Sequence, residues 1–302
     1  MIEQTFHSRE FAGLGQIATA FLAQHCVKID RACFGIAGPV QHGRVVTPNL
    51  PWVVDAQPLA RELGVRALKL INDLEANAYG IATLEPNDFV TLNPGAPDAT
   101  GNAAVISVGT GLGEAGLYWD GQDHRPFACE GGHADFAPRN QVEAELLQFL
   151  LARFQSEQHV SYERVLSGPG LRLIYEFLRD TGRGEEPAWL SEAMREGDPS
   201  AVISNAALEG RSELCLEALD LFISFYGAEA GNLALKLMAT GGVFLGGGIA
   251  PRIIKRLNGP QFLAAFTSKG RMQPLLEAMP VRVIMRDTTA LLGAARCAAQ
   301  MS

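Results

Sequence analysis

The stretch AAVISVGTGLG, residues 103–113, decides the expected fold. Its apolar run, residues 103–108, predicts a buried strand, because such a run here ends in turn-forming residues. Glycines let the backbone approach a ligand closely, and successive free N–H groups beside a threonine hydroxyl can ring a phosphate. Two interpretations stay open for this stretch alone, a phosphate-binding turn and a plain glycine turn between two strands. The turn residues concerned are Gly109, Thr110, Gly111 and Gly113.

The same glycines raise a second possibility. Gly111, Gly113 and Gly116 match G-x-G-x-x-G, the fingerprint of dinucleotide-binding proteins. That motif requires a helix to follow, with its N-terminus facing the pyrophosphate. Here residues 117–119 predict a strand that enters a turn at Asp120–Gly121. The sequence therefore favours a β-hairpin, and a nicotinamide-dependent dehydrogenase remains only as a disfavoured alternative.

The rest of the chain alternates predicted strands and helices at both ends, with a mostly helical part between them. This pattern predicts an α/β protein with two lobes. Asp55 and Asn140 are expected to cap helices, and Ser161 to cap a short turn at 162–164. The expected strands are residues 31–37, 45–47, 67–71, 88–92, 241–244 and 281–285. The expected helices are residues 13–24, 56–64, from 74 onward, 141 to about 158, 188–195, 199–208, 213–238 and 288–300.

Bulk composition narrows the class of protein. The 302 residues are 47% hydrophobic, which is enough for a large core. The net charge is −8 and no basic block occurs, so we expect no nucleic-acid partner. The first residues are polar and no uncharged apolar stretch reaches about 18 residues, so neither a signal peptide nor a membrane span is expected. Five scattered cysteines without a C-x-x-C pair indicate reduced thiols in a cytoplasmic protein, most of them core residues.

Glycines also follow a second predicted strand, near residue 244. Residues 241–242 and 246–248 are all glycine, and a helix is expected to start near Ala250. In open α/β sheets ligands bind beyond the carboxyl ends of the strands. Two glycine turns at one edge would hold a nucleotide, with the first on its phosphates and the second, at Gly247 and Gly248, near its adenosine. Simple loop flexibility is the competing interpretation.

Asn72 and Asp73 stand at the end of a predicted strand, where a helix begins. Both residue types cap helices well, so a cap is the simpler interpretation. The functional interpretation is a carboxylate that takes a proton from a hydroxyl, with an amide holding a neighbouring oxygen.

The loop EGGHADF, residues 130–136, collects Glu130, His133 and Asp135. Glu and His suit the hydroxyls of a polyol, because together they offer acceptors and a ring that donates or accepts. A local hydrogen-bonded loop carries equal weight. A metal site that includes Cys129 matches no established zinc spacing. Glu163, in the first turn after Ser161, has the simpler interpretation of a residue that favours a helix dipole.

Five blocks of sequence together resemble the bacterial glucokinase family, ATP-dependent hexose kinases of the actin-like ATPase superfamily. The blocks are LINDLEA, SVGTGLGEA, EGGHADFAP, HVSYERVLSGPG and GGVFLGGGI, in this order. The resemblance extends from about Phe21 to Ala298. It implies a two-lobed ribonuclease-H-like fold with mixed sheets flanked by helices and a helical insert in the larger lobe. The lobes would be residues 1–83 with 286–302, and residues 84–285.

The resemblance also implies the chemistry. The γ-phosphate of ATP would pass to the 6-hydroxyl of glucose, in the cytoplasm, at the entry to glycolysis. Asp73 would be the general base, and Asn72, Glu130, His133 and Glu163 would bind the sugar hydroxyls. Mg²⁺ would arrive with ATP, held mainly by phosphates and water rather than by a protein metal site. The nucleotide would contact Gly109, Thr110, Gly111, Gly113, Gly247 and Gly248.

The sequence departs from the family at its start. Family members open with a strand and a D-x-G-G-T-x-x-R phosphate loop, which this sequence does not contain. The residues IEQTFHSREFAGLGQI resemble the segment after that loop, so we expect an unpaired strand edge in the small lobe. Either in-frame DNA upstream encodes the loop, which is the expectation, or the chain is a shortened sugar-binding protein with impaired catalysis. Sugar epimer and oligomeric state, a homodimer included, stay open.

Overall fold

A computed structural model describes residues 2–155 and 159–301. Contacts within the chain divide these residues into two compact units. Unit 1 comprises residues 2–85, 126–128 and 288–301, and unit 2 comprises residues 86–125, 129–155 and 159–287. The division into lobes expected from the sequence stays a prediction, and each unit is described by itself.

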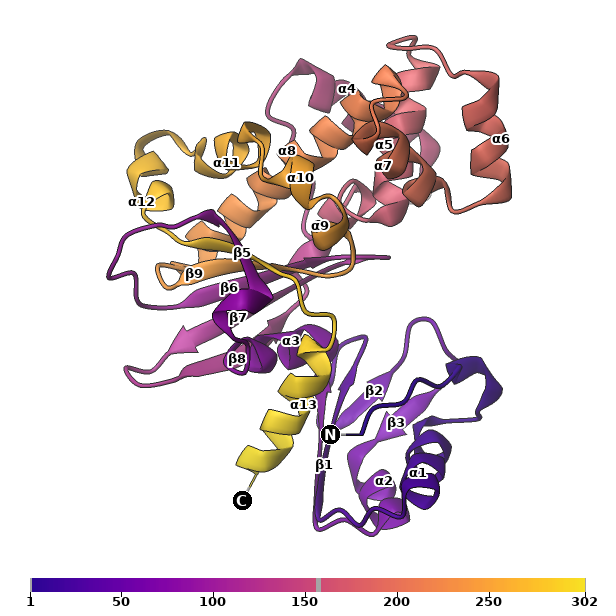
Figure 1. Cartoon of the computed structure of the whole chain (residues 1–302), viewed down its shortest axis with the longest axis vertical. Helices are drawn as coiled ribbons and strands as arrows, with labels where there is room; N and C mark the ends of the chain where they lie inside the picture. Colours follow the sequence, from indigo (N-terminus) through magenta and orange to yellow (C-terminus); the bar gives the residue numbers. More distant parts are fainter. Residues whose placement is uncertain (1, 156–158, 302) are drawn as a thin grey trace. The chain divides into compact units, whose positions relative to one another are not determined.

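Unit 1 is built around a parallel pair of strands, β1 and β4 (Figure 1). Helix α13 packs against both β1 and α3, while α2 packs against β4. Asp55 caps α2 as expected, since its Oδ1 accepts a 3.1 Å hydrogen bond from the Gln57 N–H. The elements are η1 (Ser8–Glu10), α1 (Leu14–His25), β1 (Arg31–Ile36), β2 (Arg44–Val46), β3 (Val53–Asp55), α2 (Ala56–Leu63), β4 (Ala67–Asn72), α3 (Asp73–Ile81) and α13 (Thr289–Gln300).

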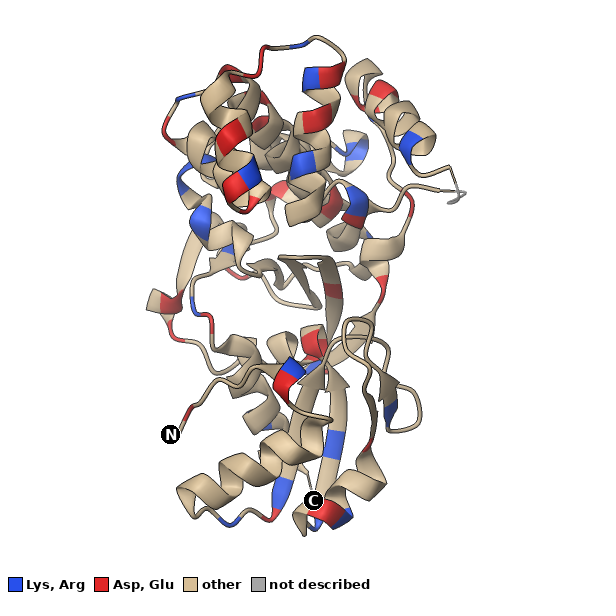
Figure 2. Cartoon of the chain, turned by 90° about the vertical axis from the view of Figure 1, so that its right-hand side faces the viewer, with Lys and Arg blue, Asp and Glu red and all other residues tan. Residues whose placement is uncertain are grey.

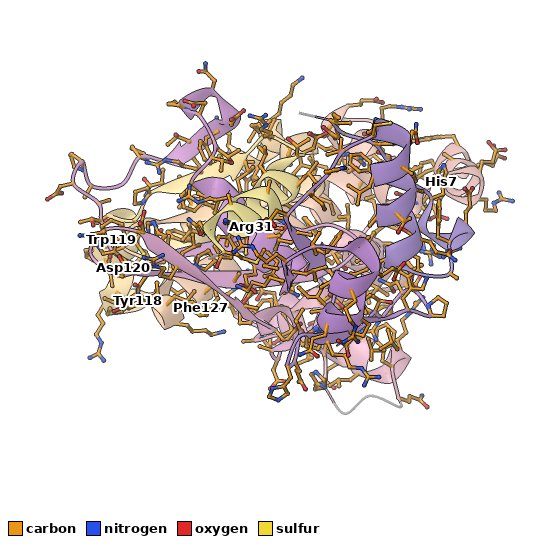
Figure 3. All side chains as sticks on the ribbon, turned by 90° about the horizontal axis from the view of Figure 1, so that it is seen from below. His7, Arg31, Tyr118, Trp119, Asp120 and Phe127 are labelled. Atoms are coloured by element: carbon orange, nitrogen blue, oxygen red, sulfur yellow. The ribbon has the colours of Figure 1, made fainter. Side chains whose placement is uncertain are left out.

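Strand β1 pairs on one side only within the described residues, so the expected unpaired edge is present. An apolar cavity of about 490 Å³ lies beside this strand, lined by side chains such as Phe21, Phe34 and Leu292 from α1, β1 and α13. Arg31, labelled in Figure 3, donates hydrogen bonds to the carbonyls of Ala299 and Met301 and so ties β1 to the end of α13.

The core of unit 2 is a mixed sheet with the strand order β5-β10-β9-β6-β7-β8 in the described part of the chain (Figure 1). Strand β6 lies in its middle, parallel to β9 and antiparallel to β7, and the strand expected at residues 103–108 is thereby confirmed. The strands are β5 (Phe89–Asn93), β6 (Ala103–Val108), β7 (Leu112–Trp119), β8 (His124–Cys129), β9 (Gly242–Gly246) and β10 (Val281–Ile284).

Helix α8 packs on β6 and β9, and α5, α7 and α11 pack around it. Its side chains at Phe222, Phe225 and Tyr226 are almost fully buried, so burial of apolar surface stabilises this layer. The helices are η2 (Pro86–Asp88), η3 (Gly131–His133), α4 (Gln141–Arg153), η4 (Tyr162–Arg164), α5 (Gly168–Asp180), α6 (Ala188–Glu196), α7 (Pro199–Leu208), α8 (Glu213–Leu237), α9 (Ile249–Arg252), α10 (Ile254–Leu257), α11 (Pro260–Thr267), η5 (Gly270–Met272) and α12 (Gln273–Glu277).

The mixed α/β fold expected from the sequence is confirmed, with local corrections. Strands β3 and β8 and helices α10 to α12 were not predicted. Helix α4 ends at Arg153, while the end expected near Gln158 falls outside the described residues. Ser161 precedes η4 but its side chain makes no capping hydrogen bond, so that part of the prediction is wrong.

Lys and Arg lie interspersed with Asp and Glu along the helices of the described residues in the view of Figure 2. The β7–β8 hairpin ends at Asp120, whose Oδ1 accepts from the N–H groups of Gln122 and Asp123. Beside it, Trp119 packs on His124 with ring centroids 5.0 Å apart, and Tyr118 is exposed (Figure 3). No helix within residues 2–155 and 159–301 has the length and apolar character needed to cross a bilayer.

Candidate functional site

The turn after β6 and the turn after β9 lie side by side at the carboxyl ends of these two strands of the unit 2 sheet. Strand pairing sets Ser107 beside Gly246, so the two parallel strands end next to each other. The β6 turn is closed by a 2.9 Å hydrogen bond from the Gly109 N–H to the Gly111 carbonyl. The Gly109 carbonyl in turn accepts a 2.8 Å hydrogen bond from the Gly168 N–H, which fixes the turn to the start of α5.

A cavity of about 400 Å³ opens at these strand ends, within unit 2. Glycine backbone and short polar side chains line part of it, and the apolar side chains of Leu171, Ile249 and Ile253 line the rest. This mixed lining suits a ligand that carries both phosphates and an apolar ring. A Cβ added at Gly109 or Gly248 would meet no atom within 4 Å, so both backbones are open to a ligand. The lining includes Gly109, Thr110, Gly168, Pro169, Asp198, Ser200, Ser204, Gly248 and Arg252.

Three glycines that were expected to contact the nucleotide make close contacts with other parts of the protein. A Cβ at Gly111 would come within 2.6 Å of Glu163 Oε2. Gly113 lies inside β7, paired with Ser107. Gly247 has a φ of +83° and packs on the Val108 backbone, so it makes the turn that presents its neighbour. Their role as direct nucleotide contacts stays a prediction.

Glu163 is held by the sheet rather than by its own helical turn. Its Oε2 accepts a 2.9 Å hydrogen bond from the N–H of Leu112, the first residue of β7. The Glu163 carbonyl accepts a 2.7 Å hydrogen bond from the Ser167 hydroxyl. The Glu163 side chain therefore bonds to strand β7, and its interpretation as a residue that favours a helix dipole does not describe this contact.

The loops that carry His133 and Glu163 run side by side. Asp135 and Ser161 form an antiparallel bridge, the Tyr162 N–H donates to the Ala134 carbonyl at 2.9 Å, and the chain pairs again at Phe136. Glu130 and His133 are exposed; Glu130 immediately precedes the short η3 turn, and His133 is its last residue. In the part of the chain that the structure describes, no group of three or more acidic, Cys or His side chains is placed to hold a metal ion.

Asn72 and Asp73 lie in unit 1, at the junction of β4 and α3. The capping interpretation of Asn72 is confirmed: its Oδ1 accepts a 2.8 Å hydrogen bond from the Leu74 N–H, while its amide donates to the Gly38 carbonyl at 3.2 Å. Asp73 is half-buried, and its Oδ1 accepts from the same N–H at 3.0 Å. Burial raises the pKa of Asp73 above its ordinary value, and the backbone N–H groups of Leu74 and Asp73 only partly oppose this.

Sequence reasoning missed two groups of residues. Ser200, Ser204 and Arg252 line the cavity from α7 and α9, and their patterns carried no signal for a site. Glu114 is 1% exposed within β7, directly under η3. A charged residue inside an otherwise apolar strand was the signal that could have found it.

Comparison with known proteins adds a family to this geometry. The family model described as glucokinase matches residues 2–301. A glucokinase of Nostoc punctiforme is 44% identical over 311 aligned positions, which cover 99% of this chain and 91% of the relative.

Solved structures agree. The crystal structure of a glucokinase from an Antarctic psychrotroph superposes with a TM-score of 0.84 at 34% identity, covering 99% of this chain and 89% of that one. A ROK family glucokinase from Streptomyces griseus, solved in complex with glucose and AMPPNP, has the same fold with a TM-score of 0.60 at 20% identity. The match covers 95% of this chain and 88% of that one.

Proposed function

The chain belongs to the glucokinase family, and on that premise we propose that it transfers the γ-phosphoryl group of ATP to the 6-hydroxyl of glucose in the cytoplasm. The observation that carries the proposal is the joint placement, within unit 2, of an open glycine-lined cavity and of the paired loops that hold His133 and Glu163. Phosphoryl transfer depends mainly on positioning and electrostatic stabilisation, so such placement is the larger part of the chemistry.

ATP is assigned to the cavity at the ends of β6 and β9. The open backbones of Gly109 and Gly248, the Thr110 hydroxyl and the Arg252 side chain offer donors and a positive charge for phosphates. Asp198, a carboxylate on the cavity wall, already caps α7 through the Ser200 N–H. Mg²⁺ is therefore assigned mainly to phosphate oxygens and water, where it neutralises charge on the transferred group.

Glucose is assigned to the exposed ends of the paired loops. Glu130 and His133 present an acceptor and a ring from η3, and Glu163 presents its carboxylate from η4. The N–H of Leu112 fixes one oxygen of Glu163, so the other can accept from a sugar hydroxyl without loss of order. Asn72 is assigned a hydroxyl through the amide hydrogen that does not bond to Gly38.

Asp73 is assigned the role of general base. Its Oδ1 bonds to the Leu74 N–H, and its Oδ2 is the atom assigned to the 6-hydroxyl proton. A raised pKa brings a carboxylate closer to the optimum for proton transfer near neutral pH.

The direct test is to incubate the protein with ATP, Mg²⁺ and glucose and to identify the product by phosphorus NMR. Formation of glucose 6-phosphate supports the proposal. If the folded protein binds glucose but forms no sugar phosphate, the chain is a sugar-binding protein of the same fold. The dehydrogenase alternative is not favoured, because strand β7 follows the glycine turn where a helix would be required.

A further inference from the structure

A buried polar cluster lies beneath the two sugar loops of unit 2. Glu114 on β7 and Glu229 on α8 are 1% and 0% exposed, and the proposed chemistry uses neither. Buried carboxyl groups are costly unless they are paired or neutral. The cluster therefore needs a physical explanation.

The two carboxyl groups have unequal partners. Glu229 accepts a 2.8 Å hydrogen bond from the Asn232 amide at Oε2, and its Oε1 lies 3.5 Å from Lys236 Nζ. Neither oxygen of Glu114 has a hydrogen-bond donor among the described residues. Glu114 instead contacts the Glu229 carboxyl group. Two ionised carboxylates cannot hydrogen-bond to each other, because neither has a proton to donate.

One shared proton resolves this arrangement. If Glu114 is the neutral acid, its O–H donates to the Glu229 carboxylate, which keeps Asn232 and Lys236 as further partners. The surroundings favour this assignment: burial and the charge of Glu229 raise the pKa of Glu114 to about 8, and Lys236 opposes them only partly. Burial raises the pKa of Glu229 less decisively, because Asn232, Lys236 and Lys269 favour its ionised form.

Glu114 also supports the turn that carries the assigned sugar residues. A Cβ added at Gly131 would overlap Glu114 Oε2, so the glycine backbone rests directly on this carboxyl group. A Cβ at Gly132 would likewise overlap the Leu112 carbonyl. Strand β7 thus supports η3 at two successive glycines, with Glu130 before them and His133 after.

The second loop connects to the same cluster. The Tyr162 hydroxyl, one residue before Glu163, accepts a 3.2 Å hydrogen bond from the Asn232 amide that also bonds to Glu229. Lys269 Nζ donates to Asn232 Oδ1 and to the Ala228 carbonyl. The cluster under η3 and η4 is therefore continuous.

We propose that Glu114, as a neutral acid whose O–H donates a hydrogen bond to Glu229, is a positioning residue that holds the Gly131–Gly132 turn in the geometry that binds sugar. The assignment of sugar to this turn rests on the proposed function. Ionisation of Glu114 places two like charges together in a buried site, and repulsion displaces the side chain that supports the turn. Sugar affinity then falls while the phosphoryl-transfer step, which involves other groups, changes little.

Other titratable groups face this pair and belong in the account. Cys129 of β8 lies beside Gly131, and burial raises the pKa of its thiol. Lys236 and Lys269 face Glu229 from α8 and from the segment before η5. Both lysines favour the ionised form of Glu229.

The first experiment tests the proton itself and needs no activity. Infrared difference spectra between wild type and Glu114→Gln are expected to show, at pH 7, a protonated carboxylic acid band that the variant lacks. Amide NMR signals of Gly131 and Gly132 are expected to titrate with a midpoint near 8 in the wild type and to stay flat in the variant. An ionised Glu114 at pH 7, or turn signals that titrate equally in both proteins, overturns the proposal.

The second experiment tests positioning. The KM for glucose is expected to rise by about tenfold for each pH unit above the Glu114 pKa in the wild type, with kcat changed less than about twofold. Glu114→Gln, which is neutral and keeps a donor for Glu229, is expected to remove that rise. Glu114→Met, which is neutral without a donor, is expected to have a raised KM at every pH.

Glu176→Gln is the matched control, since Glu176 is a buried carboxylate of α5 paired with Arg153 and Arg172. Its pH profile is expected to follow that of the wild type. If the Glu114→Gln profile does so too, Glu114 does not position the turn. If the wild type forms no sugar phosphate, the proposed function fails. The infrared and NMR spectra, together with calorimetric glucose titrations across pH, then still test whether Glu114 is neutral and positions the turn.

Discussion

The Leu112 N–H donates a 2.9 Å hydrogen bond to Glu163 Oε2, and this bond joins the central hairpin of unit 2 to a loop that follows it by some fifty residues in sequence. The donor stands where the glycine turn becomes β7. The start of β7 therefore holds both the glycine turn that faces the cavity and the carboxylate that is assigned to glucose. The residues assigned to the nucleotide and to the sugar are fixed relative to each other by this one strand.

Gly111→Ala tests that support. The added Cβ would come within 2.6 Å of Glu163 Oε2 and displace the carboxylate. We expect the KM for glucose to rise by about tenfold or more, with the KM for ATP changed far less. Steady-state kinetics with each substrate varied in turn measures both.

Gly109→Ala is its matched control two residues away. No atom lies within 4 Å of the new Cβ, which would point into open space at the cavity. Here the KM for ATP is expected to rise and that for glucose to stay near wild type. Equal effects on both substrates in both variants would contradict the separate assignments.

Glu163→Gln is expected to weaken glucose binding. The amide keeps an acceptor for the Leu112 N–H but loses the charge that strengthens hydrogen bonds to sugar hydroxyls. A loss of about tenfold in affinity, with no loss of thermal stability, is the expected calorimetric result. Unchanged affinity would remove Glu163 from the sugar site.

Asp73→Asn is expected to lower kcat by about 10³-fold and to leave glucose affinity nearly unchanged, because a general base acts in the transition state. In the wild type, burial raises the pKa of Asp73. Activity is present above that pKa, where the base is ionised, and is lost as the pH falls through it. The acid limb of the kcat profile is therefore expected above pH 3.8. A variant that keeps near-full kcat would exclude Asp73 as the base.

Stability of the wild type should depend on pH through Glu114. Its pKa is raised from 4.5 to about 8 in the folded protein, so the stabilisation by the neutral form is full below about pH 4.5 and is lost as the pH rises to about 8. Glu114→Gln cannot ionise, so its stability relative to wild type should increase over this range by up to about 1.4 kcal/mol per pH unit. Urea unfolding at several pH values measures this, and a constant difference would contradict it.

Much of the fold was predictable, for reasons that particular segments show. The run at residues 103–108 is buried on both faces and is followed by glycines. Its short length and the glycine turn that bounds it were therefore enough to predict strand β6. Helix α7 was predicted at its observed bounds, and the structure shows local reasons for its start: Asp198 caps it and Pro199 is its first residue. The misses have causes too. Strand β8 contains Pro126, which argues against a strand, yet β8 lies at the sheet edge, where proline is tolerated.

The candidate site was less predictable. Glycine turns and acidic loops indicated which segments bind ligands, but the individual contacts depend on pairs far apart in sequence. Nothing local relates Leu112 to Glu163, or Glu114 to Glu229, because each pair forms only when β7 meets another element. A strand that is buried on both faces also lacks the alternation that would have shown Glu114 to be buried.

The central claim is that the 6-hydroxyl of glucose receives the γ-phosphoryl group. The most direct measurement is ADP release from ATP and Mg²⁺ with glucose, compared with 6-deoxyglucose, which keeps the other hydroxyls but lacks the acceptor. The account predicts ADP release that requires glucose and is absent with 6-deoxyglucose, although both sugars bind. Equal ADP release with both sugars, or none with glucose from a folded protein that binds it, would contradict the account.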